Sequence, residues 1–125
     1  MHLRSAAFVL IFLLMLGASA FSEVRESVTI QSCYDGDTCR TPAGEKIRLA
    51  CIDTPELRGK RAQPERAKAA RDRLRGMVAG KTVNLRRITT DRYGRTIGEL
   101  HVDGINVQQA MVASRHAEIY WKNAH

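Results

Sequence analysis

Apolar and polar residues alternate along several short segments between residues 23 and 102, and a period of two predicts β-strands. Val28 and Ile30, for example, stand between polar neighbours. Turn-forming residues such as Pro42 and Gly44 separate the segments. The first three segments, joined by short turns, are expected to form an antiparallel meander. The expected strands lie within Glu23–Cys33, Thr38–Thr41, Lys46–Ile52, Lys81–Ile88 and Arg95–Val102.

Two other segments follow the helical period of 3.6. Pro64 suits a first helical turn and Gly80 a helix end, which predicts a helix over Gln63–Ala79. A second helix is expected from Ile105 to about Arg115. Three strands, a helix, two strands and a helix describe an α+β domain around a curled sheet. A five-stranded barrel with a helix after its third strand is an OB-fold, although periodicity alone leaves that as one option among several. The apolar face of the first helix is expected to consist of Ala67, Ala70, Leu74, Met77 and Val78.

Residues 1–20 have the pattern of a signal peptide. His2 and Arg4 precede the apolar run Ala6–Leu16, and Ala18-Ser19-Ala20 is a small-x-small cleavage site. An uncleaved anchor is the alternative. We therefore expect one domain over residues 21–125, secreted or periplasmic, and without membrane attachment once the leader is removed.

The chain is basic, with 20 Lys and Arg against 13 Asp and Glu and a net charge of +7. A small basic domain usually meets a polyanion, although solubility alone is another explanation. Export favours a disulfide among the three cysteines. Cys33 and Cys39 flank a turn and can bridge it, whereas Cys51 lies on an apolar strand. Spacing does not decide the pairing.

Candidate chemistry begins with the segment Arg48–Glu56, which has a cation at the head of an apolar strand and Asp53 and Glu56 at its tail. Pro55 cannot donate a ladder hydrogen bond, so the strand should end there. Asp37 lies on an acidic turn just upstream. If the strands pair around these turns, the three acids converge near the arginine, which is the composition of a metal-assisted phosphoryl-transfer site. A plain hairpin turn is the alternative for the upstream acids, because Asp-Gly is common in hairpins.

Two arginines begin strands. Arg48 opens an apolar strand, where an arginine needs an anion, and Arg95 opens the fifth strand. Two fixed guanidinium groups can bind the non-bridging oxygens of a phosphodiester and stabilise developing charge. Structural salt bridges are the alternative. Glu56 can take a proton from an attacking water or orient it, or it is a surface acid.

Three segments in order, Asp35–Thr38, Arg48–Glu56 and Asp91–Arg95, resemble the signature segments of the thermonuclease family, which staphylococcal nuclease typifies. The resemblance covers about residues 28–120. It implies an OB-fold nuclease that requires Ca²⁺ and cleaves DNA and RNA without regard to the sugar, at the P–O5′ bond. We expect a monomer that prefers single-stranded or frayed substrates.

The resemblance also implies roles. By motif position, Asp37 and Asp53 would be the metal carboxylates, and Thr54 would offer its backbone carbonyl. Glu56 would be the general base or the group that orients water.

Arg48 and Arg95 would bind the phosphate and stabilise the transition state. Arg92 would contact phosphate, and Tyr93 would contact the nucleotide.

The loop after Glu56 is shorter than in the type enzyme. The chain also ends where the family usually continues into a further helical segment, so the two expected helices belong to a minimal member or to one truncated from three. Two alternatives to the nuclease therefore stay open: a non-catalytic OB module that binds nucleic acid, and a truncated nuclease of low activity.

Overall fold

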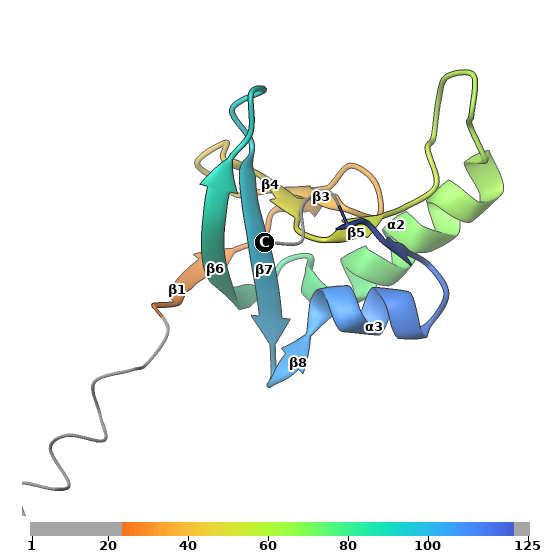
Figure 1. Cartoon of the computed structure of the whole chain (residues 1–125). Coiled ribbons are helices and arrows are strands. Elements are labelled where there is room, and N and C mark those ends of the chain that lie inside the picture. The colour runs from red at the N-terminus through yellow and green to blue at the C-terminus, as the bar shows by residue number, and fades with distance from the viewer. Residues whose placement is uncertain (1–23, 122–125) are drawn as a thin grey trace, which may run out of the picture.

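The computed structural model describes residues 24–121, in which a strongly curled sheet is covered by two helices (Figure 1). The expected signal peptide lies outside the described residues. The helices are α2 (Pro64–Val78) and α3 (Val107–Ala113). The strands are β1 (Glu26–Thr29), β2 (Ser32–Cys33), β3 (Thr38–Arg40), β4 (Lys46–Leu49), β5 (Ile52–Asp53), β6 (Thr82–Thr90), β7 (Thr96–Val102), β8 (Ile105–Asn106) and β9 (Glu118–Ile119).

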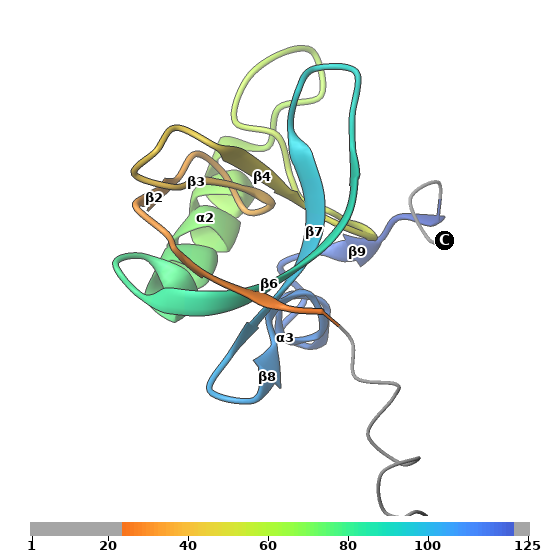
Figure 2. The ribbon, with the colours of Figure 1, turned by 90° about the vertical axis from the view of Figure 1, so that its left-hand side faces the viewer.

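The main sheet closes into a barrel because the continuous segment that carries β1 and β2 pairs with both of its ends. Its strand order is β1-β6-β7-β4-β3-β2, with β8 paired to β7. β1 and β2 follow one another in sequence but lie at opposite ends of this order (Figure 2). Between them, Ile30 N donates to Lys81 O at 3.0 Å and Gln31 N to Arg40 O at 2.8 Å. Counted as one strand, β1 and β2 complete the five expected strands, and the α+β fold of the OB type is confirmed.

The pairing of β4 explains how the barrel is joined. The antiparallel ladder from β2 through β3 to β4 confirms the predicted meander. β4 then pairs in parallel with β7, which follows it by about fifty residues. This long-range pairing brings the start of β7 beside the last strand of the meander.

The third expected strand is interrupted. Cys51 has a φ of +66°, a left-handed conformation that ends β4 and starts β5 on a new course. β5 leaves the main sheet and pairs with β9, with Ile52 opposite Ile119. The prediction of one continuous strand over Lys46–Ile52 is therefore wrong at Ala50 and Cys51.

The fourth strand also differs from its prediction. It extends to Thr90 instead of ending at Ile88, and its register against β7 shifts after Arg87. Arg87, the last residue before the shift, is exposed, and its guanidinium forms ion pairs with Glu26 and Glu45 on the surface.

The second helix is shorter than expected because its first two residues form β8. Asn106 caps α3 by accepting a hydrogen bond from Gln109 N at 3.0 Å. Gln108, the residue before Gln109, is buried and bridges two backbone groups of β7. Its Oε1 accepts from Leu100 N at 3.1 Å, and its Nε2 donates to Gly98 O at 3.0 Å.

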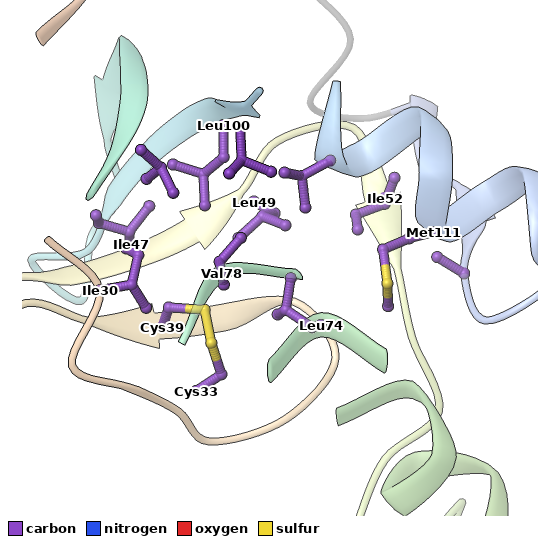
Figure 3. Packing of buried hydrophobic residues seen from close by; sticks show 14 of the residues in the cluster. Ile30, Cys33, Cys39, Ile47, Leu49, Ile52, Leu74, Val78, Leu100 and Met111 are labelled. Atoms are coloured by element: carbon purple, nitrogen blue, oxygen red, sulfur yellow. A yellow bond between two sulfur atoms is a disulfide. The ribbon is translucent and has the colours of Figure 1, made fainter. Parts of the chain in front are cut away.

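The core lies between the inner face of the barrel and the apolar faces of both helices (Figure 3). On α2 the predicted face is buried except for Met77, which is half-buried. A disulfide between Cys33 and Cys39 is part of this core and joins β2 to β3. Within residues 24–121, no helix is long and apolar enough to cross a membrane. Fully buried side chains include Ile30, Ile47, Leu49, Leu74, Leu85, Leu100 and Met111.

Candidate functional site

The acidic turn between β2 and β3 is anchored on three sides. The carbonyl of Asp37 accepts from Leu49 N at 2.8 Å, and the amide of Asp37 donates to the Asp35 carboxylate at 3.1 Å. Gly36 has no side chain because none would fit: a Cβ there would meet Ala70 Cβ on α2 at 2.8 Å and Thr54 Cγ2 at 2.9 Å. The turn is thus pressed against both the helix and the end of β5.

The Asp37 carboxylate is buried, with only 6% of the residue exposed. Its Oδ2 accepts from the amide of Thr54 at 3.2 Å and from the Thr54 hydroxyl at 2.9 Å. Its Oδ1 accepts from the hydroxyl of Thr38 at 3.1 Å. Three donors from two different turns therefore fix the orientation of this carboxylate.

Arg48 links the two acid-bearing turns. Its Nη2 lies 3.5 Å from Asp37 Oδ2 and 3.8 Å from Asp53 Oδ1, and its Nη1 donates to Leu49 O at 2.7 Å. The Arg48 side chain is 11% exposed, whereas that of Asp53 is 62% exposed. The structure thus brings together four of the predicted site residues: Arg48, Asp37, Asp53 and Thr54.

Glu56 lies beside this cluster on the loop that follows β5. Its side chain is exposed, and its carbonyl accepts from Gln63 N at 2.9 Å. Together with Asp53 and Thr54 it lines a hollow of ≈ 590 Å³. The other charged groups of this hollow, which sequence reasoning missed, are Arg61, Arg66, Arg115, His116 and Glu118.

The β6–β7 hairpin carries the remaining predicted residues. Arg95 Nε donates to Asp91 Oδ2 at 2.7 Å, so the structure holds this arginine on Asp91 and records no contact between it and the acid cluster within residues 24–121. Arg92 and Tyr93 lie exposed nearer the hairpin tip, where Arg92 Nη2 donates to Tyr93 Oη at 2.6 Å. The hairpin and the loop after β5 both project toward the top of Figure 1, with β4 and β5 between them.

Asp35, on the acidic turn, has a raised pKa. Burial, and then the negative charge of Asp37, raise the pKa of Asp35 from 3.8 to about 6. The acidic turn therefore carries one carboxylate that charges only near neutral pH. Sequence reasoning treated Asp35 as a simple turn residue, and nothing in the local pattern signals its burial.

The donors of the cluster fit a hard cation. Two carboxylate oxygens, on Asp37 and Asp53, lie within 4 Å of the same Arg48 nitrogen, so both acids converge on one point of the site. Thr54, whose amide and hydroxyl bind Asp37, can add its backbone carbonyl to this donor set. Within residues 24–121 no group of three or more His, Cys, Asp and Glu side chains is arranged to hold a metal. Two carboxylates completed by a carbonyl and water suit Ca²⁺ and do not suit Zn²⁺.

The fold and this cluster define a small OB-type domain with a mixed carboxylate–arginine site at the rim of its barrel. Residues 46–125 match the family model of staphylococcal nuclease homologues. The chain belongs to the staphylococcal nuclease family.

Several related proteins agree with this assignment. The chain is 38% identical over 90 residues to an uncharacterized endonuclease of Escherichia coli O157:H7, covering 69% of this chain and 56% of that protein. It is 32% identical over 111 residues to an uncharacterized endonuclease of Haemophilus influenzae, covering 86% and 60%. It is 40% identical over 67 residues to a probable staphylococcal-like nuclease, CAN1, of rice, covering 54% and 19%. The chain thus spans little more than half the length of these bacterial relatives.

Proposed function

We propose that this chain is an exported, Ca²⁺-dependent endonuclease that hydrolyses the phosphodiester bonds of DNA and RNA. The observation that carries the proposal is the placement of Arg48 between Asp37 and Asp53, beside Thr54. Family membership and the names of the relatives support it. A protein that only binds a polyanion has no use for acids at this point, because they repel phosphate.

Asp37, Asp53 and the carbonyl of Thr54 are the residues that would hold Ca²⁺. A bound divalent cation polarises a phosphoryl oxygen and offsets the charge that accumulates on it during displacement. The hydrogen bonds from Thr54 and Thr38 hold the Asp37 carboxylate in one orientation before any cation arrives. That preorganisation lowers the cost of assembling the site.

The two arginines act on the phosphate. Arg48 is nearly buried and fixed by three contacts, so its guanidinium offers its charge without having to reorganise. Arg95 uses Nε to bind Asp91, and within residues 24–121 no recorded hydrogen bond or ion pair uses its terminal nitrogens. Asp91 thus orients Arg95 and leaves the fork of the guanidinium for a non-bridging oxygen. Arg92 and Tyr93 contact the nucleotide beyond it.

Glu56 is the group that deprotonates or orients the attacking water. Water adds to phosphorus, the P–O5′ bond breaks, and the leaving O5′ takes up a proton. The products are a 3′-phosphate and a 5′-hydroxyl. The exposed position of Glu56 on a hollow next to Asp53 and Thr54 supports this role, since water reaches it freely.

Export is part of the proposal. The leader pattern of residues 1–20 supports it, and so does the disulfide between Cys33 and Cys39, because disulfides persist in oxidising compartments. The mature protein would be a monomer in the periplasm or outside the cell.

The test is cleavage of single-stranded DNA and of RNA by the full chain, in Ca²⁺ and in chelator. Glu56→Ser and Arg95→Ala are each expected to lower kcat by about 10²–10³, the cost of losing one such group in well-studied sites. Their matched controls are Glu65→Ser and Arg73→Ala, which alter exposed residues of α2 and should leave the rate unchanged. Cleavage that survives the chelator, or equal loss in the controls, would contradict the proposal. Binding without cleavage by a folded chain would instead indicate a non-catalytic module.

A further inference from the structure

A second hollow, of ≈ 570 Å³, lies across the outer face of the sheet beside the acid–arginine cluster. Its floor is formed by β2, β3 and β4, and its edges by Arg95 of the β6–β7 hairpin and Arg75 of α2. It is lined by Ser32, Cys33, Tyr34, Asp35, Thr38, Cys39, Arg40, Lys46, Arg75 and Arg95.

The pairing register sets the cations of this hollow in a row. Arg40 is opposite Lys46 in the β3–β4 ladder. Ile47 is opposite Thr96 in the parallel β4–β7 ladder, so Lys46 lies next to Arg95. Directly paired residues share one face of a sheet. Three cations, Arg40 on β3, Lys46 on β4 and Arg95 just before β7, therefore cross the outer face over about 10 Å.

These cations are available to a ligand. Arg40 and Lys46 are exposed, and none of the ion pairs recorded among residues 24–121 involves Arg40, Lys46 or Arg75. Arg75 is held over β2 because its Nε donates to Cys33 O at 3.0 Å. Asp35 is the only acid of the lining in the described chain, and it is half-buried with its carboxylate on the amide of Asp37.

An exposed aromatic ring lies to one side of the row, next to Thr38, whose carbonyl accepts from Tyr34 N at 2.9 Å. Tyr34 is 62% exposed although it is a large ring next to the core disulfide. Cations that follow a backbone beside an aromatic ring on which a base can stack form the usual binding surface for single-stranded nucleic acid. Charge along the backbone and stacking on a ring are both open to any base, so such binding would tolerate any sequence.

The hollow is continuous with the proposed catalytic site. Thr38 lines the hollow, is paired with Arg48 in the β3–β4 ladder, and donates to Asp37 Oδ1. Arg95 belongs to both places. A strand whose scissile phosphate lies at Arg48 and Arg95 can thus continue over Lys46 and Arg40.

We propose that Tyr34, Arg40, Lys46 and Arg75 form a subsite that holds the single strand next to the scissile phosphate. The phosphates lie on the cation row, and a base stacks on Tyr34. This inference rests on the proposed nuclease function for its substrate, but it concerns residues to which no role has been given above.

The first test is binding in chelator, where cleavage is suppressed, of the full chain to a labelled 12-nucleotide single strand followed by fluorescence anisotropy. The charge variant is Arg40→Ser with Lys46→Ser. Its matched control is Arg73→Ser with Lys81→Ser, which removes the same charge from exposed residues that line neither hollow. The slope of log K against log salt should become shallower by about 1.4 in the charge variant, about 0.7 for each lost phosphate contact, and should be unchanged in the control.

The second test isolates stacking. Tyr34→Ala should weaken binding of the 12-mer about tenfold, and Tyr34→Phe, which keeps the ring, should retain wild-type affinity. Where the chain cleaves, the ratio of kcat/KM for the 12-mer to that for a thymidine dinucleotide should fall by a similar factor in Tyr34→Ala. Circular dichroism of each variant confirms that it is folded.

The outcomes separate the two proposals. Loss of 12-mer binding in the subsite variants, without cleavage by the wild-type chain, supports the subsite and overturns the nuclease. Ca²⁺-dependent cleavage with wild-type binding and salt slope in the subsite variants overturns the subsite and leaves the nuclease standing. An equal loss on a blunt 12-base-pair duplex overturns the assignment to single strands.

Discussion

Replacing Gly36 with alanine adds one methyl group at the point where the acidic turn lies against its neighbours. That methyl would meet Ala70 Cβ at 2.8 Å and Thr54 Cγ2 at 2.9 Å, at least about 0.6 Å and 0.5 Å inside ordinary contact. Ala70 Cβ is attached directly to the backbone of α2, and Thr54 is a β-branched residue with a stiff χ1. Neither group can swing away, so the turn itself must move.

The cost is that of overpacking a well-packed site, about 1–3 kcal/mol. We expect the Gly36→Ala variant to lose about 2 kcal/mol of its free energy of unfolding, a large share of a small domain's total. Since Asp37 follows Gly36 directly and accepts two hydrogen bonds from Thr54, the same displacement loosens the carboxylate. Ca²⁺ affinity should therefore fall as well.

The measurement is urea unfolding in chelator, followed by calcium titration of each variant. Gly76→Ala is the matched control: it makes the same chemical change inside α2, where a Cβ meets nothing within 4 Å, and should stabilise the chain by about 0.5–1 kcal/mol. In the double variant Gly36→Ala with Ala70→Gly, part of the loss should be recovered beyond the sum of the single effects. A Gly36→Ala variant as stable as the wild type, with unchanged calcium affinity, would refute the reasoning.

Three further predictions concern stability. Because the pKa of Asp35 is raised from 3.8 to about 6, its contribution to stability is fully present below pH 3.8 and is lost as the pH rises through about 6. In chelator, Asp35→Asn should therefore raise the free energy of unfolding by about 1–2 kcal/mol at pH 7, after allowance for partial exposure, and should not change it at pH 3.5. Equal gains in urea unfolding at both pH values would contradict this. Gln108→Leu leaves the buried amide of Leu100 without a partner, although Gly98 O keeps Ala50 N as a donor, and should cost about 1–3 kcal/mol by urea unfolding. The exposed Gln109→Leu should cost almost nothing. Reducing the disulfide between Cys33 and Cys39, which closes a short loop, should lower the free energy of unfolding by about 2 kcal/mol. In the Cys33→Ser, Cys39→Ser double variant, a reductant should leave the free energy of unfolding unchanged.

Local pattern was sufficient to predict the convergence of Asp37 with Arg48. Two strands joined by the short turn at Pro42–Glu45 must pair as a hairpin, and the observed register puts Thr38 opposite Arg48. Asp37, the residue before Thr38, then lies close to the Arg48 guanidinium. The apolar face of α2 was predicted for the same reason, because helical period is a property of the helix alone.

Features that depend on long-range pairing were not predicted. The row of cations exists because β4 pairs in parallel with β7, a partner about fifty residues away, and no local signal sets Lys46 beside Arg95. The break at Cys51 likewise depends on β9, whose pairing draws β5 out of the main sheet.

The electrostatics of the site explain why acids and a polyanion can coexist in it. Asp37 and Asp53 would repel a phosphate if their charge were free, yet both lie within 4 Å of the Arg48 guanidinium. Arg48 is nearly buried, so its attraction for these acids is little screened by salt. A phosphate that approaches Arg48 must share it with two carboxylates, whereas a divalent cation held by those carboxylates would free the guanidinium for the phosphate. Phosphate binding at the cluster should therefore depend on the cation, whereas binding to the cation row at Arg40 and Lys46 should not.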